Sequence, residues 1–155
     1  ERSVTVVAWN TVIYGILMLI ADMIGKQEKT IENMTLKNAL FIGVAQALAL
    51  IPGTSRSGIT MTAARFLNYT RPDAARFSFL LGIPAIAGAG VLTVGEALAS
   101  GDTITMDAIY CAILTFFAGL AAIAFLMALV RRISFLPFVL YRMVLGGFLL
   151  FMIYS

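Results

Sequence analysis

Four long apolar runs, at residues 4–24, 77–99, 109–130 and 136–154, constrain the fold of this chain more than any other feature. Each run reaches roughly the 20 residues that an α-helix needs to cross about 30 Å of hydrocarbon. The composition agrees, since 61% of the residues are hydrophobic and only 12% are charged, whereas soluble domains carry about one quarter charged residues. The sequence therefore predicts an all-α, polytopic membrane protein.

The remaining composition excludes several other classes. The net charge of +3 is modest and sits mostly in loops, which indicates membrane topology rather than nucleic-acid binding. A single cysteine, Cys111, cannot form an internal disulfide. The chain begins with Glu1 rather than Met and enters an apolar run almost at once, and we expect it to be a piece of a longer protein.

Two shorter apolar segments, 38–51 and 59–68, flank a polar loop with the sequence PGTSRSG at residues 52–58. The first would reach only about 21 Å as a helix at 1.5 Å per residue. Two half-length helices around a Gly, Pro and Ser tip predict a re-entrant hairpin over residues 38–68. Non-helical backbone at membrane depth is tolerated only where it is buried in protein or lines a polar cavity.

The distribution of charge predicts the orientation. Basic residues lie before the hairpin, after it, and between the last two spans: Lys26, Lys29, Lys37, Arg71, Arg76, Arg131 and Arg132. The loop at 100–107 carries two acidic residues and no basic one. The positive-inside rule places the basic groups in the cytoplasm and the acidic loop outside. This assignment is consistent only if the segment 38–68 returns to the side from which it starts.

The polar loop has the chemistry of an anion site. A cation within the membrane is a functional-site hypothesis by default, and the guanidinium of Arg56 matches phosphate oxygens two at a time. The helix expected from Ile59 onwards would point its unpaired N–H groups and positive dipole end at the loop. We expect Arg56 to be the catalytic cation. The expected substrate-binding residues are Gly53, Thr54, Ser55, Ser57, Gly58 and Thr60.

Each of these groups also has a structural explanation. Ser55 or Ser57 would serve as the N-cap of the following helix, and Thr60 would bond back to its own helix. Arg56 would instead pair with a carboxylate elsewhere in the chain. Arg65 and Arg76 lie near the cytoplasmic surface, and Arg142 lies a few residues into the last span. All three are expected to extend their charged ends to the membrane surface.

The chain has no histidine, and its carboxylates fall at span ends or in loops, so none is expected beside Arg56 as a general base. No metal-ligand spacing occurs either, so no metal-binding residue is assigned. The sequence predicts an anion site without a complete catalytic set.

The motif at residues 49–60, which contains PGTSRSGIT, resembles the second signature of the bacterial undecaprenyl pyrophosphate phosphatases, the bacitracin-resistance family. The similarity continues through FSFLL at 77–81 with Ile83-Pro84, and through RISFLPF at 132–138 with Tyr141-Arg142. It covers most of the chain from about Leu36 to the C-terminus, with the order of the three blocks preserved.

The resemblance implies a fold of two inverted-topology halves, each with a re-entrant helix pair and three spans. Residues 1–35 would be the last span of the first half and a cytoplasmic loop. Residues 36–155 would be the second repeat, with the re-entrant pair 38–68 and spans 77–99, 109–130 and 136–154. The implied location is the bacterial cytoplasmic membrane.

The implied reaction is hydrolysis of undecaprenyl pyrophosphate to undecaprenyl phosphate, which recycles the lipid carrier of peptidoglycan synthesis. Arg56 corresponds to the arginine that binds the pyrophosphate, and Ser55, Ser57 and Thr60 occupy matching positions. A divalent cation, Mg²⁺ or Ca²⁺, is expected, bound mainly by groups outside this chain. Expected partners are the polyprenyl pyrophosphate lipid, the bilayer and the missing N-terminal half, with a homodimer left open and no nucleic acid.

The family's first signature, with paired glutamates, a serine and a histidine, does not occur in this chain. The alternative function is therefore a non-enzymatic transporter or flippase for a phosphate or lipid phosphate. Such a protein would use the same anion site at the midplane of inverted repeats and would need no nucleophile or base.

Overall fold

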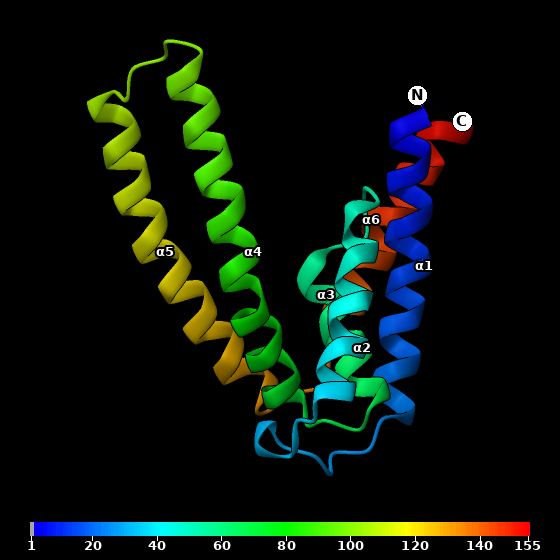
Figure 1. Cartoon of the computed structure of the whole chain (residues 1–155). Coiled ribbons are helices and arrows are strands. Elements are labelled where there is room, and N and C mark those ends of the chain that lie inside the picture. The colour runs from blue at the N-terminus through cyan, green and yellow to red at the C-terminus, as the bar shows by residue number, and fades with distance from the viewer. Residues whose placement is uncertain (1) are drawn as a thin grey trace.

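The computed structural model describes residues 2–155, and these form an all-helical chain (Figure 1). The α-helices are α1 (Arg2–Ile24), α2 (Leu36–Ala47), α3 (Arg56–Phe66), α4 (Arg71–Ala99), α5 (Met106–Val130) and α6 (Leu136–Tyr154). Two short 3₁₀ turns, η1 (Ile31–Asn33) and η2 (Leu48–Leu50), precede and follow α2.

Four of these helices, α1, α4, α5 and α6, are long and apolar enough to cross a membrane. The prediction of an all-α chain with four long apolar helices is confirmed. Helices α4 and α5 begin before their apolar runs, because polar caps extend them. Thr70 caps α4, in which Pro72 occupies the first turn, and the Thr105 hydroxyl accepts a hydrogen bond from the Ala108 N–H at 3.2 Å at the start of α5.

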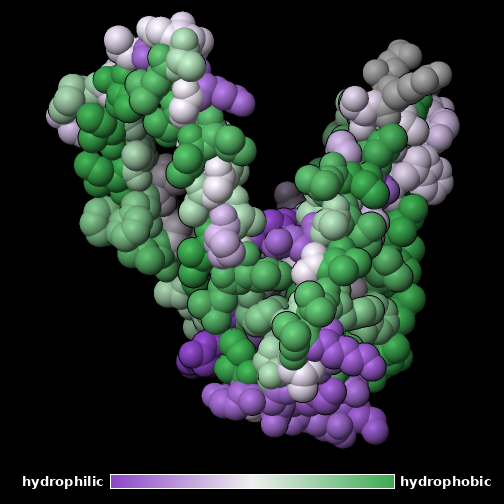
Figure 2. All heavy atoms as spheres, viewed as in Figure 1, coloured by the Kyte–Doolittle hydropathy of each residue, from purple (hydrophilic) through white to green (hydrophobic). Residues whose placement is uncertain are grey.

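The helices form two groups joined at one end of the molecule (Figure 1). Helices α1 and α6 lie side by side, while α4 and α5 form a hairpin that leans away from them. Hydrophobic side chains cover most of the outer surface seen in Figure 2. Hydrophilic residues gather around the loop between α1 and α2, and a smaller hydrophilic patch lies at the floor of the gap between the two groups.

The short helices α2 and α3 form a pair that starts and ends at the same end of the molecule (Figure 1). The loop before α2 is bonded to the turn after α3. The Lys26 N–H donates to the Asn68 side-chain oxygen at 3.1 Å, and the Thr70 N–H donates to the Lys29 carbonyl at 2.9 Å. Asn68 has a positive φ of 71°, a conformation that asparagine accepts at helix C-termini.

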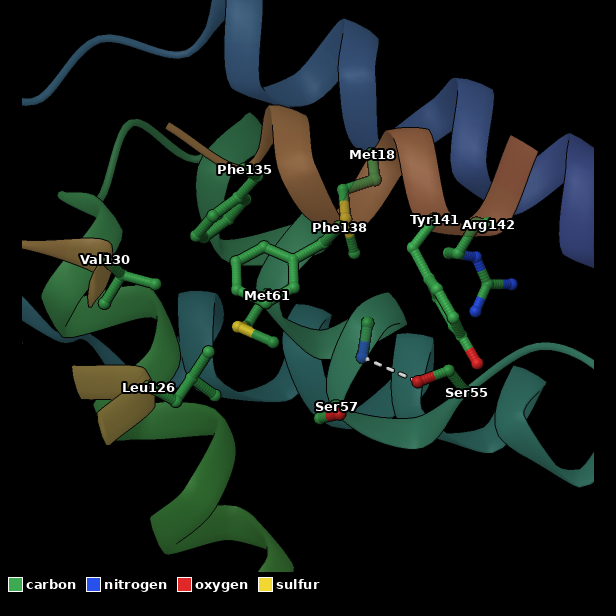
Figure 3. Close-up of a pocket in the computed structure, with 11 residues that line it drawn as sticks. Met18, Ser55, Ser57, Met61, Leu126, Val130, Phe135, Phe138, Tyr141 and Arg142 are labelled. Atoms are coloured by element: carbon green, nitrogen blue, oxygen red, sulfur yellow. Dashed lines mark hydrogen bonds between the residues drawn. The ribbon is translucent and has the colours of Figure 1, made fainter. Parts of the chain in front are cut away.

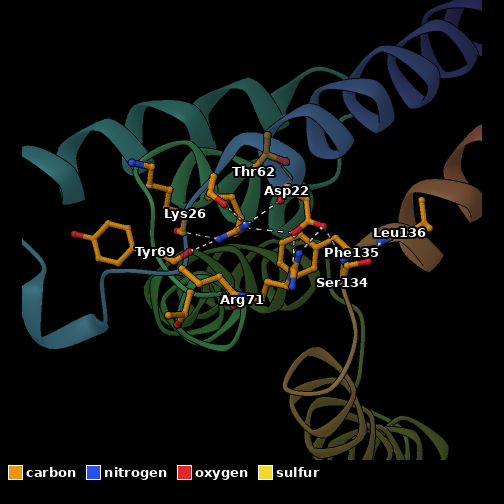
Figure 4. Close-up of polar contacts among 12 residues, drawn as sticks. Asp22, Lys26, Thr62, Tyr69, Arg71, Ser134, Phe135 and Leu136 are labelled. Atoms are coloured by element: carbon orange, nitrogen blue, oxygen red, sulfur yellow. Dashed lines mark hydrogen bonds and ion pairs between the residues drawn. The ribbon is translucent and has the colours of Figure 1, made fainter.

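A buried ionic cluster joins the ends of α1, α3, α4 and α6 (Figure 4). One carboxylate oxygen of Asp22 lies 2.7 Å from Arg71 Nε and 3.4 Å from Arg65 Nε. The other accepts the Phe135 N–H at 3.2 Å. Because a buried charge is costly without partners, this cluster holds the four helix ends in one arrangement.

The Arg65 guanidinium also serves as a common donor for the ends of α1 and α3. It donates to the carbonyls of Asp22, Gly25 and Tyr69 at 2.9, 2.8 and 2.7 Å. Arg65 is only 1% exposed, so the prediction that it extends to the membrane surface is wrong. The unpaired carbonyls at a helix C-terminus attract a cation strongly enough to keep it inside. Arg76, in contrast, is exposed.

Candidate functional site

The polar loop forms the tip of the α2–α3 pair, and α3 begins at Arg56 rather than at the predicted Ile59. Ser55 is the N-cap, and its hydroxyl oxygen accepts the Gly58 N–H at 3.2 Å. This confirms the N-cap interpretation for Ser55. By helix geometry, the N–H groups of Arg56 and Ser57 are left without partners inside the helix. The tip therefore presents the positive end of α3.

Ser55 itself has an uncommon backbone conformation, with φ 61° and ψ 114°. A non-glycine residue with positive φ is rare, and such strain persists only where the surroundings hold it. The tip is held from two sides: the Asn10 side chain of α1 donates to the Pro52 carbonyl at 2.8 Å, and Arg142 Nη2 of α6 donates to the Gly53 carbonyl at 2.8 Å. The contact with Asn10 lies near the middle of α1.

Gly53 is required where α1 approaches the tip. Its φ is +88°, and a Cβ there would lie 2.7 Å from the Val7 carbonyl oxygen. No side chain fits that space without a shift of backbone, and the conformation itself favours glycine.

Arg56 points toward α4 and fills the space left by the missing side chain of Gly82. A Cβ on Gly82 would collide with Arg56 Nη1 and lie 2.7 Å from Nη2. Nη1 is buried and has no hydrogen-bond partner among the described residues. The ion pairs found within residues 2–155 do not include Arg56. Its charge is therefore positioned but not neutralised by this part of the chain.

The serines face a different side of the tip. Ser55, Ser57 and Gly58 line a cavity of about 260 Å³ with Tyr141 and Arg142 of α6 (Figure 3). Arg56 does not line this cavity; it lines a separate groove with Gln46 and Ala85, among others. The remaining cavity walls are apolar and come from Met18, Met61, Leu126, Val130, Phe135 and Phe138.

The two threonines of the predicted site lie deeper. Thr60 is fully buried, and its hydroxyl group bonds to the Arg56 carbonyl at 3.0 Å and to Ser78 Oγ at 2.6 Å. The prediction that it bonds back to its own helix is confirmed. Thr54 is 1% exposed, and its hydroxyl has no partner among the described residues. Neither threonine lines the cavity.

Three residues at the tip were not predicted: Gly82, Tyr141 and Arg142. Arg142 was expected to extend to the membrane surface, and that prediction is wrong, because it bonds to the tip and lines the cavity. Two signals were available for Arg142: its place within an apolar span, and its place in the third block of family similarity. Gly82 lies inside the second block of similarity, between FSFLL and Ile83-Pro84, but the sequence does not show that an arginine packs against it.

The charged side chains around the tip are positive. Two cations, Arg56 and Arg142, lie on either side of it, and no carboxylate lines the cavity. Within residues 2–155 there is no group of three His, Cys, Asp or Glu side chains that could hold a metal ion. Among the described residues, the one deeply buried carboxylate is that of Asp22, which pairs with Arg65 and Arg71. Around the tip, the described residues therefore offer positive charge and hydrogen-bond donors.

Comparison with known proteins matches the same residues to a family. The family model described as "Bacitracin resistance protein BacA" matches residues 1–148. The chain is 52% identical over 149 residues to an undecaprenyl-diphosphatase of Erythrobacter litoralis, an alignment that covers 96% of this chain and 52% of the relative. It is 48% identical over 150 residues to an undecaprenyl-diphosphatase of Chromohalobacter salexigens, covering 96% of this chain and 57% of the relative.

A third relative, an undecaprenyl-diphosphatase of Alteromonas mediterranea, is 45% identical over 155 residues, covering 99% of this chain and 58% of the relative. The chain thus spans about half the length of the curated relatives it matches. The match of the family model includes the tip, Arg56, Arg142, the long helices α1, α4 and α5, and α6 as far as residue 148. The chain belongs to the bacitracin resistance protein BacA family.

Proposed function

We propose that this chain supplies the phosphate-binding part of a membrane phosphatase that hydrolyses undecaprenyl pyrophosphate to undecaprenyl phosphate. The observation that carries the proposal is the guanidinium of Arg56, which is held against Gly82 at the N-terminus of α3 with a buried Nη1 that has no partner among the described residues. The names of its relatives, undecaprenyl-diphosphatases, support the same reaction.

In this mechanism Arg56 binds phosphate oxygens through paired, charge-assisted hydrogen bonds. Negative charge spreads over the phosphoryl oxygens as the phosphoanhydride breaks, and preorganised donors aimed at that charge lower the barrier. The N–H groups at the start of α3 add a second, backbone source of positive potential. The nucleophile and the general acid and base would come from outside residues 1–155.

The α2–α3 pair would be re-entrant, dipping into the membrane from the cytoplasmic face and returning to it. Its length supports this, as does its return to the end where Lys26, Lys29 and Arg71 gather. Residues 36–155 would be the second of two inverted repeats, in the bacterial cytoplasmic membrane. A divalent cation, Mg²⁺ or Ca²⁺, and the groups that hold it would belong mainly to the other half of the site; a homodimer remains open.

The test measures phosphate release from undecaprenyl pyrophosphate in detergent micelles. The enzyme is the native-length protein, that is, the protein at the full length that its cell produces. We expect that protein to be active, and we expect both its Arg56→Ala variant and the chain 1–155 alone to lose at least about 99% of the rate, since removing a single transition-state donor costs 10²–10³. Arg132→Ala, which removes an exposed cation from the loop between α5 and α6, is the matched control and should keep full activity. Normal turnover by Arg56→Ala would refute the assignment.

The absence of any carboxylate from the lining of the tip cavity favours one alternative, a transporter or flippase for a phosphate or lipid phosphate. Such a protein binds and moves its anion without breaking a bond, so a base is unnecessary. The same assay decides between the two. Retained binding of lipid phosphate with no phosphate release by the native-length protein would favour the transporter.

A further inference from the structure

The cavity on the α6 side of the tip has an amphipathic lining. Its polar end is formed by Ser55 and Ser57 of the tip with Tyr141 and Arg142 of α6 (Figure 3). Its other walls, which come from α1, α3, α5 and α6, are methionine, leucine, valine and phenylalanine side chains. A cavity of about 260 Å³ is too small for a whole lipid and suits a head group with the first part of its chain.

Arg142 has more donors than the protein uses. A guanidinium carries five N–H groups, and the described residues accept a hydrogen bond from only one of its nitrogens, Nη2, which donates to the Gly53 carbonyl. Nε is buried and has no partner among the described residues, and the ion pairs of residues 2–155 do not include Arg142. A partly buried cation without a counter-ion is costly, so this arrangement favours an anion in the cavity.

The neighbouring groups would help to bind that anion. In Figure 3, Tyr141 and Arg142 project from α6 toward Ser55. The Ser55 oxygen already accepts the Gly58 N–H, so the hydroxyl hydrogen of Ser55 is left to donate. The N-terminus of α3 adds the positive end of its dipole at the same end of the cavity. Charged, hydroxyl and dipolar donors therefore converge on one end of the cavity.

We propose that Arg142 is a second phosphate ligand, which binds the phosphate joined to the hydrocarbon chain of a lipid phosphate while the apolar walls take the start of that chain. The proposal rests on the function proposed above. Undecaprenyl pyrophosphate has two phosphates. The proposal assigns the phosphate next to the lipid chain to the side of the tip that faces α6, and the terminal phosphate to the side where Arg56 lies. Arg142 thus has two roles, since one nitrogen positions Gly53 and the others touch the ligand.

The test compares Arg142→Gln and Arg142→Lys in the native-length protein in detergent micelles, with Arg132→Gln as control. Glutamine keeps an amide that can donate to the Gly53 carbonyl but removes the charge, whereas lysine keeps the charge. The probes are undecaprenyl phosphate and inorganic phosphate, with Kd measured by calorimetry, together with kcat and KM for undecaprenyl pyrophosphate. The midpoint of thermal unfolding without ligand reports on the fold.

We expect Arg142→Gln to raise the Kd of undecaprenyl phosphate and the KM of undecaprenyl pyrophosphate by about ten- to a hundredfold, because a charged hydrogen bond is lost. Arg142→Lys should recover part of that loss, and Arg132→Gln should bind like the unchanged protein. If Arg142 served only to hold Gly53, the Gln and Lys variants would bind equally well, and that result would overturn the proposal.

Two further variants keep the test decisive. If Arg142→Gln unfolds, Tyr141→Phe removes a donor from a residue that is 69% exposed, and it should weaken binding without changing the unfolding midpoint; unchanged binding would count against the site. Met61→Ser makes an apolar wall polar. It should weaken binding of undecaprenyl phosphate but not of inorganic phosphate, and equal effects on both would identify free phosphate, rather than a lipid phosphate, as the ligand.

The outcome for this site is separable from the outcome for the proposed function. Loss of turnover in Arg56→Ala with unchanged binding in Arg142→Gln would overturn only the Arg142 site. No turnover by the unchanged protein, with Arg142-dependent binding of undecaprenyl phosphate, would overturn the phosphatase and leave the lipid phosphate site standing.

Discussion

The position of Arg56 depends on Gly82 of the neighbouring helix α4, which has no side chain and so leaves space for the guanidinium. The guanidinium lies where the Cβ of residue 82 would be if α4 carried anything larger than glycine there. Nearby glycines of α4 have no such role: a Cβ on Gly88 would meet no atom within 4 Å. At the scale of single residues, the proposed anion site therefore needs both Arg56 and the space that Gly82 leaves for its guanidinium.

Gly82→Ala should displace the Arg56 guanidinium and lower kcat/KM for undecaprenyl pyrophosphate by about ten- to a hundredfold, since small misplacements of a catalytic group are that costly. Stability should hold or rise slightly, because alanine is the better helix former by up to about 1 kcal/mol. The measurement is steady-state kinetics beside thermal unfolding, on the native-length protein.

Gly88→Ala in the same helix is the matched control for that substitution: it should leave the kinetics near their starting values and raise stability by up to about 1 kcal/mol, because the added Cβ meets no other atom. Unchanged kinetics in Gly82→Ala would mean that Arg56 reaches its ligand from another position. In that case the space at Gly82 would not be part of the site.

At the scale of helices, the α2–α3 pair is fixed by the buried cluster around Asp22, which lies at the end of the pair opposite the tip. Asp22 binds Arg65 of α3 and Arg71 of α4, and accepts the N–H of Phe135 just before α6. Its side chain is 5% exposed and that of Arg65 is 1% exposed. Removing one partner from such a cluster leaves an uncompensated buried charge.

Asp22→Ala should therefore lower the free energy of unfolding by about 3–5 kcal/mol, measured by denaturant titration in detergent micelles. Glu28→Ala is the control, because Glu28 also pairs with a cation but its contact with Lys26 is exposed and 4.0 Å long. An exposed pair contributes at most about 1 kcal/mol. Equal losses in the two variants would argue against a structural role for the buried cluster.

At the scale of the whole molecule, the basic loops and the acidic loop lie at opposite ends (Figure 1). The loop before α2, the start of α4 and the loop between α5 and α6 share one end, and the turn between α4 and α5 lies at the other. The short α2–α3 pair makes this possible, since a full crossing there would invert every later helix.

Cysteine labelling in intact cells checks this topology. In a Cys111→Ala background, single cysteines replacing Glu28, Arg76 and Asp102, all exposed, would be treated with a membrane-impermeant maleimide. We expect only the Asp102→Cys protein to be labelled from outside, with the other two labelled after the membrane is opened. Labelling of Glu28→Cys and Arg76→Cys from opposite sides would rule out the re-entrant pair.

The sequence alone determined the class of fold and the place of the tip. Long apolar runs require spanning helices because unpaired backbone groups are not tolerated in hydrocarbon, and this depends only on local composition. Two hydrogen bonds were likewise predictable: the N-cap bond of Ser55, and the bond from the Thr60 hydroxyl to a carbonyl of its own helix. Both join residues that are close in sequence.

The tertiary structure decided which cation meets which partner. Arg56 stands between two serines in the sequence, yet it faces Gly82 while Ser55 and Ser57 face Arg142, which lies 89 residues beyond Gly53 in the chain. Arg65 and Arg142 were expected at the membrane surface and are held inside by backbone carbonyls of other segments. An arginine turns inward or outward according to the acceptors that packing brings within its reach, and those acceptors belong to distant parts of the chain.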